Sequence, residues 1–205
     1  MLSSKAVTDV VDSTAQRIIS QEFLHLGFSF DIMELTYKSC KRTLNMSLKV
    51  AIVNYKDIQQ SQDLVFLLDS YAKDPMGGAE GLSDYSKANL ITELSKRSTA
   101  FSVIAYADNK PAGLINCFFG FSTFKCKPLV YIHDVVVLPE FRGQKISLKM
   151  LEYVEVYAKE NDCCKMTLEV LEGNKVAKSA YLKFGFKGYE LDPELGKALF
   201  WEKVI

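Results

Sequence analysis

The ten residues LPEFRGQKIS, from Leu138 to Ser147, constrain the fold of this chain more than any other stretch. They follow an apolar run typical of a strand and open an apolar pattern with the spacing of a helix. A glycine-containing turn at a helix start leaves several backbone N–H groups free, and the helix dipole adds partial positive charge there. Arg142 and Lys145 would add charged side chains. Many such turns are only surface connections, so the stretch predicts a phosphate cradle only if the rest of the chain agrees.

The other patterns predict one α/β domain over residues 48–205, preceded by a helical extension over residues 1–45. The extension has apolar residues at helical spacing, and such an amphipathic pair of helices needs a surface to cover. That surface is either the main domain or a second subunit, which leaves a homodimer open. We predict strands at 48–55, 101–107, 113–121, 129–138, 165–171, 185–191 and 198–205. We predict helices at 61–74 and 83–97, with Ser61 and Ser83 as N-caps, and further helices at 146–160 and 174–185.

Composition and charge narrow the class of protein. Hydrophobic residues make up 48% of the chain and charged residues 24%, as in a soluble globular protein. Lys plus Arg and Asp plus Glu each number 25, whereas a nucleic-acid binder usually carries a basic excess. Five cysteines without C-x-x-C spacing and only two histidines argue against a metal site, and we expect reduced thiols. Without a signal-like N-terminus or an apolar run of about 18 residues, we expect a cytoplasmic protein that does not enter a membrane.

Three segments together resemble one known family. The residues from Arg142 to Ser147 resemble the pyrophosphate-binding pattern [QR]-x-x-G-x-[GA] of the GNAT superfamily of N-acetyltransferases, with Lys145 where glycine is usual and serine at the last position. IHDVVVLPEFRG (132–143) resembles that family's central strand, and NKVAKSAYLKFGF (174–186) resembles its N-x-x-A-x-x-x-Y-x-x-x-G-F helix. The order of predicted elements in the main domain also matches the family fold.

The resemblance implies an α/β fold with a central mixed, mostly antiparallel sheet, splayed parallel central strands and flanking helices. It also implies acetyl-CoA as co-substrate, held by the loop and by free backbone groups of the first splayed strand. Because glycine tolerates a positive φ and lysine does so less readily, we expect an ordinary backbone at Lys145. The residues implied in cofactor binding are Val135, Val136, Val137, Arg142, Gly143, Gln144, Lys145, Ile146, Ser147, Leu148 and Asn174.

Acyl transfer needs an amine that loses a proton, a stabilised oxyanion and a thiolate that gains a proton. By resemblance, Tyr181 is the general acid and a backbone N–H near Val136 stabilises the oxyanion. His133 titrates near neutrality and is the first candidate base, and Glu169 on the neighbouring strand is the second. Deprotonation through water, with no dedicated base, stays open. Asp134 is expected to point to the sheet face opposite His133.

The implied function is transfer of an acetyl group from acetyl-CoA to a primary amine in a ternary complex. A small-molecule acceptor is favoured, and a protein amine stays open. By analogy with the family, Glu80, Asp84 and Phe121 would line the acceptor side, because carboxylates beside aromatic rings suit a cationic amine. The alternative is a CoA-binding sensor or scaffold that has lost catalysis, which Lys145 favours and Tyr181 disfavours.

Overall fold

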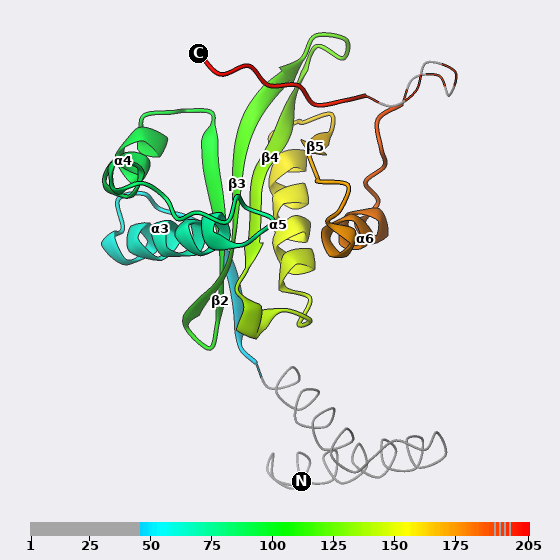
Figure 1. Cartoon of the computed structure of the whole chain (residues 1–205). Coiled ribbons are helices and arrows are strands. Elements are labelled where there is room, and N and C mark those ends of the chain that lie inside the picture. The colour runs from blue at the N-terminus through cyan, green and yellow to red at the C-terminus, as the bar shows by residue number, and fades with distance from the viewer. Residues whose placement is uncertain (1–45, 191, 193, 195, 197) are drawn as a thin grey trace, which may run out of the picture. The chain divides into compact units, whose positions relative to one another are not determined.

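The computed structural model describes residues 46–190, 192, 194, 196 and 198–205, so the predicted helical extension over residues 1–45 lies outside the described residues. From Leu48 the chain forms one compact unit, a five-stranded sheet with helices on both faces (Figure 1). The predicted α/β class and mixed sheet are confirmed. The strands are β1 (Leu48–Ile52), β2 (Ala100–Ala107), β3 (Lys110–Ser122), β4 (Lys127–Val137) and β5 (Met166–Leu168). The helices are α3 (Ile58–Lys73), α4 (Asp84–Ser95), the short 3-10 turn η1 (Pro139–Phe141), α5 (Ile146–Glu160) and α6 (Lys175–Phe184).

The strands lie in the sheet in chain order, from β1 to β5. The first four pair antiparallel, and β4 with β5 is the one parallel pair in the described sheet. A parallel pair needs a crossover, which α5 supplies between β4 and β5. The tight β2–β3 turn places Asp108 and Asn109 at φ +49° and +61°, in the left-handed region that a two-residue hairpin favours.

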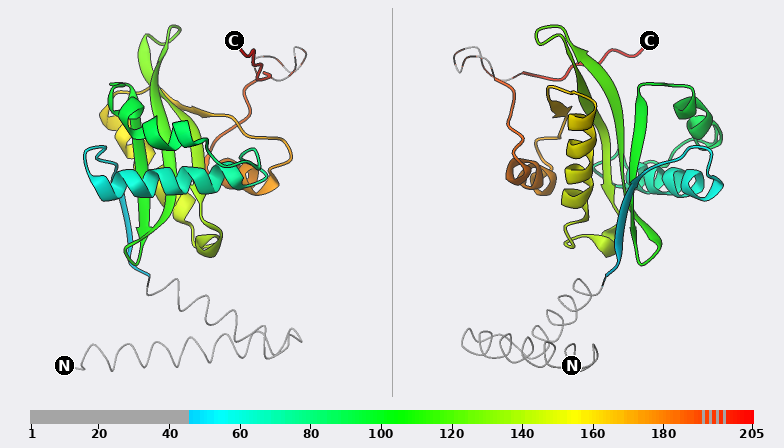
Figure 2. Two further views of the ribbon diagram at one scale, coloured as in Figure 1. Left: turned by 60° about the vertical axis from the view of Figure 1, so that its left-hand side comes forward. Right: turned by 180° about the vertical axis from the view of Figure 1, so that it is seen from behind.

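Two layers of helix cover the sheet. The helices α3 and α4 lie on one face, and α5 lies on the other (Figure 2). The buried residues of α5 recur with helical period along one stripe: Ile146, Met150, Leu151, Val154 and Ala158. This stripe packs on apolar side chains of the central strands, and each buried Leu, Ile or Val contributes about 1.5–3 kcal/mol. The predicted bounds of α5 match the structure.

Several predicted elements have different ends in the structure. Strand β1 ends at Ile52 rather than at residue 55, and β3 begins at Lys110 rather than at residue 113. Helix α3 begins three residues earlier than predicted, because the Asp57 carboxylate accepts a hydrogen bond from the Gln60 N–H at 2.9 Å and caps it. The predicted cap, Ser61, lies inside the helix and its hydroxyl donates to the Tyr55 carbonyl at 3.2 Å. Strand β5 is shorter than the predicted 165–171, since only three of its residues pair with β4.

The two predicted C-terminal strands are wrong for the described residues. After α6 the described residues form no strand, although Glu190 makes an isolated bridge and the Ala198 N–H donates a hydrogen bond to the Tyr189 carbonyl. Apolar and aromatic residues predict a strand, but a strand also needs a partner, and here the large side chains of the tail face solvent. Phe200 and Trp201 are 71% and 82% exposed. No described strand therefore pairs with the outer edge of β5.

Candidate active site

The loop between η1 and α5 presents backbone rather than side chains. Gly143 has φ +78°, and a Cβ there would meet nothing within 4 Å. Lys145 is the N-cap of α5 but makes no side-chain capping bond, so no described side chain occupies the N–H groups of the first turn. These donors and the helix dipole fit the phosphates of a nucleotide cofactor such as CoA. The expectation of an ordinary backbone at Lys145 is wrong, because its φ is +60°.

The lysine therefore adopts the left-handed conformation that the family's glycine allows. That conformation costs a non-glycine residue about 1 kcal/mol. The strand and the helix on either side of the loop hold Lys145 in it. The loop geometry follows from these flanking elements, and the substitution of glycine by lysine does not prevent it.

Arg142 lies in the loop as predicted, but its guanidinium is already engaged. Its Nη2 donates to Asp74 Oδ2 at 2.9 Å and its Nε donates to the Val137 carbonyl at 3.1 Å. The Met76 backbone N–H, and next the guanidinium, lower the pKa of Asp74. Asp74 ends α3, so this ion pair ties the loop before α5 to the loop after α3.

The central strands part in the way that the resemblance implies. Parallel pairing between β4 and β5 runs from Val130 opposite Met166 to Ile132 opposite Leu168 and goes no further. Beyond that point Val135, Val136 and Val137 remain paired with β3 on their other side. The backbone edge of this valine segment that faces away from β3 is therefore not in the described ladder. Val136 is 6% exposed, so its side chain belongs to the core while its backbone borders the gap.

A β-bulge places His133. Ile132 is opposite Cys117 and Asp134 is opposite Asn116, so His133 is the extra residue between two pairs. The bulge brings His133 Nδ1 within 3.1 Å of Asp134 Oδ1, although neighbours on a regular strand face apart. The expectation that Asp134 points away from His133 is wrong. The hydrogen bond with Asp134 raises the pKa of His133, burial opposes that shift, and the charge of Glu169 adds to it.

The second candidate base lies beside the first. The Tyr131 hydroxyl donates a hydrogen bond to the Glu169 carboxylate, and the Tyr131 ring meets the His133 ring edge-on at 5.7 Å. Burial, and next this hydrogen bond, raise the pKa of Tyr131 to about 12. The ring of Phe118 meets His133 from β3 at 5.8 Å. Carboxylates and aromatic rings therefore surround the imidazole, a setting that suits a cationic group.

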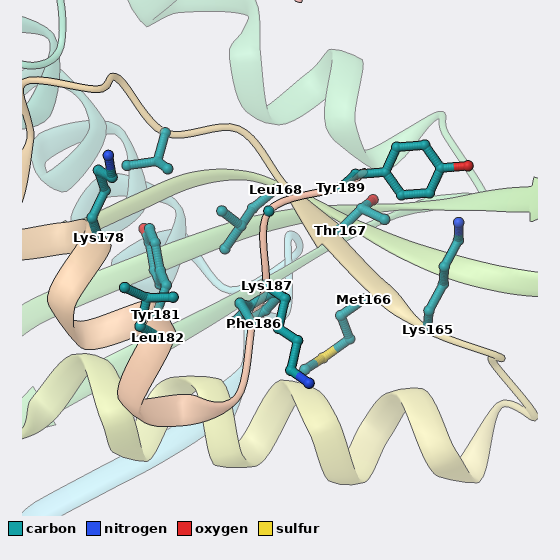
Figure 3. Close-up of a pocket in the computed structure, with 12 residues that line it drawn as sticks. Lys165, Met166, Thr167, Leu168, Lys178, Tyr181, Leu182, Phe186, Lys187 and Tyr189 are labelled. Carbon is teal, nitrogen blue, oxygen red and sulfur yellow. The ribbon is translucent and has the colours of Figure 1, made fainter. Parts of the chain in front are cut away.

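Tyr181 lines a pocket of about 510 Å³ between β5, α6 and the segment that follows α6 (Figure 3). Burial, and next the neighbouring Tyr71, raise the pKa of Tyr181 to about 12, so the phenol keeps its proton at neutral pH. The pocket is mainly apolar, with three lysines in its wall. Its lining residues are Lys165, Met166, Thr167, Leu168, Val170, Lys178, Tyr181, Leu182, Phe186, Lys187, Gly188 and Tyr189.

Tyr71 of α3 is coupled electrostatically to groups in both halves of the site. Burial, followed by the charges of Asp134 and Asp74, raises the pKa of Tyr71, and Tyr71 in turn adds to the raised pKa of Tyr181. At the start of α6, Asn174 Oδ1 accepts from the Ala177 N–H at 3.1 Å as an N-cap, which leaves its Nδ2 for another partner.

The three predicted acceptor-side residues are all exposed, and Phe121 lies away from His133. Glu80 lies exposed in the loop after α3, and Asp84 is exposed in the first turn of α4. Phe121 is 60% exposed and lies opposite Pro128, five residues along β4 from His133, which is roughly 16 Å. Within residues 46–205 as described, no cluster of His, Cys, Asp or Glu could hold a metal ion, and no helix is long and apolar enough to cross a membrane.

A model described as the acetyltransferase (GNAT) family matches residues 63–186, which is more than half of the chain. The chain belongs to the GNAT family. The match includes both halves of the site described above, from α3 to Phe186. Acetyl-CoA is the acyl donor that this family membership implies, and the loop and the splayed strand fit it.

Individual relatives resemble parts of this GNAT protein. A thialysine N-epsilon-acetyltransferase of Bos taurus is 37% identical over 68 residues, which is 33% of this chain and 39% of that relative. An uncharacterized N-acetyltransferase of Archaeoglobus fulgidus is 31% identical over 102 residues, which is 46% of this chain and 69% of that relative. An aminoglycoside N-acetyltransferase in complex with CoA shares the fold at 17% identity and a TM-score of 0.62, over 78% of this chain and 96% of that one. The chain thus matches well under half the length of the bovine enzyme.

Sequence reasoning missed three residues of this GNAT site. The sequence places Tyr71 and Asp74 only within the helix predicted at 61–74. Strand alternation predicts that Asp134 points away from His133. Bulges are common next to active sites, but no residue type in the sequence marks one at His133. No signal in the sequence links α3 to α6.

Proposed function

We propose that the protein transfers an acetyl group from acetyl-CoA to a small primary amine in a ternary complex. The observation that carries the proposal is the point where β4 and β5 part, next to His133. Parallel pairing ends at Ile132, the residue before the bulge, and Asp134 Oδ1 lies 3.1 Å from His133 Nδ1 there. A histidine base beside the gap that would receive the thioester arm of the cofactor is what aminolysis requires.

Each group has one task in this proposal. Neutral His133 accepts a proton from the amine acceptor. Glu169 and the rings of Phe118 and Tyr131 attract the acceptor while it is still a cationic ammonium. A backbone N–H of the valine segment stabilises the oxyanion, and Tyr181 donates its proton to the departing thiolate. The N–H groups of the loop before α5 hold the phosphates of the donor, and Asn174 Nδ2 bonds its pantetheine arm.

The choice of a small acceptor rests on the carboxylates and aromatic rings around His133 and on relatives. The names of two similar proteins state thialysine and an aminoglycoside as acceptors, and both are amine-bearing small molecules. Glu80 and Asp84 are exposed carboxylates in a loop and at a helix start, so we assign them to attraction of a cation rather than to direct contact.

One observation favours a second candidate function, a CoA-binding sensor without turnover. Arg142, the expected phosphate ligand, is bound to Asp74, so binding of a phosphate to Arg142 would release the end of α3. Such a release would report occupancy of the loop to the neighbouring helix. The position of Tyr181 in the family motif argues for turnover instead, since a sensor does not use an acid.

The test is release of free thiol from acetyl-CoA with a panel of amines, including diamines, thialysine, aminoglycosides and an N-terminal peptide. The proposal expects release that depends on one class of small amine and identifies an acetylated product by mass. Acetyl-CoA binding without acetylation of any acceptor would replace the enzyme with the sensor. Turnover on the peptide alone would move the acceptor to a protein amine.

A further inference from the structure

A row of polar side chains crosses the α3 face of the sheet and ends at His133. Three of its members are register partners on adjacent strands, Ser102 opposite Asn116 and Asn116 opposite Asp134. Partners directly opposite one another lie on the same face, so the three side chains form a line across β2, β3 and β4. We call this line, together with the tyrosine that follows β1, the polar row: Tyr55, Ser102, Asn116 and Asp134.

The polar row is continuously hydrogen-bonded. The Tyr55 hydroxyl lies 2.9 Å from Ser102 Oγ, and Ser102 Oγ lies 2.7 Å from Asn116 Oδ1. Asn116 Nδ2 lies 3.0 Å from Asp134 Oδ2. Ser102 is 0% exposed and Asn116 is 4% exposed, so water does not substitute for these partners.

Donor and acceptor chemistry gives the row one direction. An amide oxygen only accepts, so the Ser102 hydroxyl must donate to Asn116 Oδ1 and has only lone pairs left for Tyr55. The Tyr55 hydroxyl is therefore the donor to Ser102. The opposite orientation of the Asn116 amide would set its oxygen against the Asp134 carboxylate, which excludes it. Every hydrogen bond in the row thus points towards Asp134.

The direction of the row decides what Asp134 offers to His133. One carboxylate oxygen accepts from Asn116, and the other, Oδ1, lies 3.1 Å from His133 Nδ1. An ionised carboxylate accepts there, so Nδ1 of the neutral imidazole carries its proton. The lone pair then belongs to Nε2, the nitrogen on the far side of the ring from Asp134.

We propose that the polar row positions His133, holding its neutral ring as the Nδ1–H tautomer so that Nε2 is the atom that accepts the proton of the amine. The role of Nε2 as proton acceptor rests on the proposed acetyltransferase function. The charged and titratable groups around the imidazole are Asp134 on β4, Glu169 after β5 and Tyr131 on β4, and the charge of Asp134 also raises the pKa of Tyr71 on α3. Asp134 and the other members of the row are positioning residues, since they act through His133.

Nitrogen NMR of the protein labelled with ¹⁵N-histidine tests the inference in the absence of substrate. The chain has two histidines, and His133→Gln removes and so assigns the signals of His133. Above its pKa, the wild-type His133 is expected as Nδ1–H, whereas an unconstrained imidazole favours Nε2–H. Its titration is expected above 6.5, in the direction that Asp134 imposes.

Variants of the row separate positioning from packing. In Ser102→Ala the Asn116 amide loses its donor, so the Nδ1–H population is expected to fall and the His133 pKa to move back towards 6.5. Asn116→Ala should lower the Nδ1–H population and the His133 pKa by more, and Tyr55→Phe should lower them by less. The serine and tyrosine variants still test the inference if the asparagine variant does not fold. Tyr106→Phe is the matched control, because its hydroxyl bonds Asp63 at 2.8 Å outside the row. It should leave both readouts unchanged.

An Nε2–H tautomer in the wild type, or an unchanged tautomer and pKa in both Ser102→Ala and Asn116→Ala, would overturn the inference. An equal change in the Tyr106→Phe control would also overturn it, because the effect would then be general loosening of the sheet. These spectra do not depend on turnover. If no amine in the panel causes thiol release from acetyl-CoA, only the proposed function fails. If the protein is active but Ser102→Ala and Asn116→Ala leave the His133 tautomer unchanged, only the inference about the polar row fails.

Discussion

The loop before α5 and the bulge in β4 lie at the two ends of one short stretch of chain, yet they prepare for chemistry by opposite means. The loop offers N–H groups and a helix dipole, and one of its two predicted cationic ligands, Arg142, is bound to Asp74. The bulge offers side chains, because one extra residue turns His133 towards Asp134. In the proposed function, the first region binds through its backbone and the second reacts through its side chains.

The difference teaches which changes each region tolerates. Lys145 replaces a family glycine and still adopts φ +60°, because the strand and the helix on either side determine the path of the loop. The bulge has no such tolerance, since every hydrogen bond of the polar row behind it has one direction. Substitutions in the loop should therefore alter binding by modest factors, and substitutions around the bulge and its acid should alter turnover by large ones.

The largest effect is expected for Tyr181→Phe. The ring keeps its edge contact with Phe186, but the proton for the thiolate is lost, so turnover should fall about 10²–10⁴-fold. The acetyl-CoA dissociation constant should stay within about twofold of wild type. Single-turnover kinetics at saturating amine measure the first quantity and calorimetry the second. An unchanged rate of the chemical step would remove Tyr181 from the role of acid.

His133→Gln should lower turnover at neutral pH by about 10²-fold, the low end of general base catalysis. The base must be neutral, so wild-type kcat/KM should rise with pH through a pKa above 6.5, since Asp134 and Glu169 raise it. That rising limb should vanish in the glutamine variant. In Glu169→Gln it should move to lower pH, because one of the charges that raise the pKa is gone. A limb that persists without His133 would assign proton removal to water or to another group.

Arg142→Glu should weaken acetyl-CoA binding by about 1–3 kcal/mol, because a cation at the phosphate cradle becomes an anion. Turnover at saturating acetyl-CoA should be unchanged. Asp74→Asn is the matched control, since it breaks the same ion pair and leaves Arg142 free, so it should bind equally well or more tightly. Calorimetry on both variants decides between a role in phosphate binding and a role only in tying α3 to the loop. Equal weakening in both would favour the second.

The smallest effect is expected for Lys145→Gly. Relief of about 1 kcal/mol of left-handed strain exceeds the roughly 0.5 kcal/mol of added chain entropy in the unfolded state, so the unfolding free energy should rise by about 0.5 kcal/mol. Lys149→Gly, inside α5, should instead lower it by about 1 kcal/mol. Urea unfolding measures both. Destabilisation by Lys145→Gly would mean that the lysine side chain itself supports the loop.

The sequence predicted most of the fold because local patterns and local caps agree there. The apolar stripe gave α5 with correct ends, and Ser83 and Asn174 cap α4 and α6 as their positions suggest. It failed where formation depends on a distant partner. The tail at 198–205 is rich in apolar residues like a strand but joins no described sheet, and the pairing of β5 with β4 ends at Ile132 opposite Leu168. Pairing is a tertiary property that no window of sequence contains.

The candidate site divides in the same way. The loop, the valine segment, Asn174 and Tyr181 could be named from the sequence, because each belongs to a motif within one strand–loop–helix unit. Tyr71, Asp74 and the polar row could not, since they meet only when α3 and three strands are assembled. Asp134 shows the reason most clearly: strand alternation turns it away from His133, and one inserted residue reverses that.

The central claim is that cofactor binding and acyl transfer depend on separate groups. Its most direct test is the double variant Arg142→Glu/Tyr181→Phe, which changes one residue of the binding loop and the proposed acid on α6. We predict that its acetyl-CoA affinity equals that of Arg142→Glu and its saturated rate equals that of Tyr181→Phe, with the free-energy changes additive within about 0.5 kcal/mol. A coupling well beyond that value, or a loss of turnover in Arg142→Glu at saturating acetyl-CoA, would contradict the account, because binding and chemistry would then share the same groups.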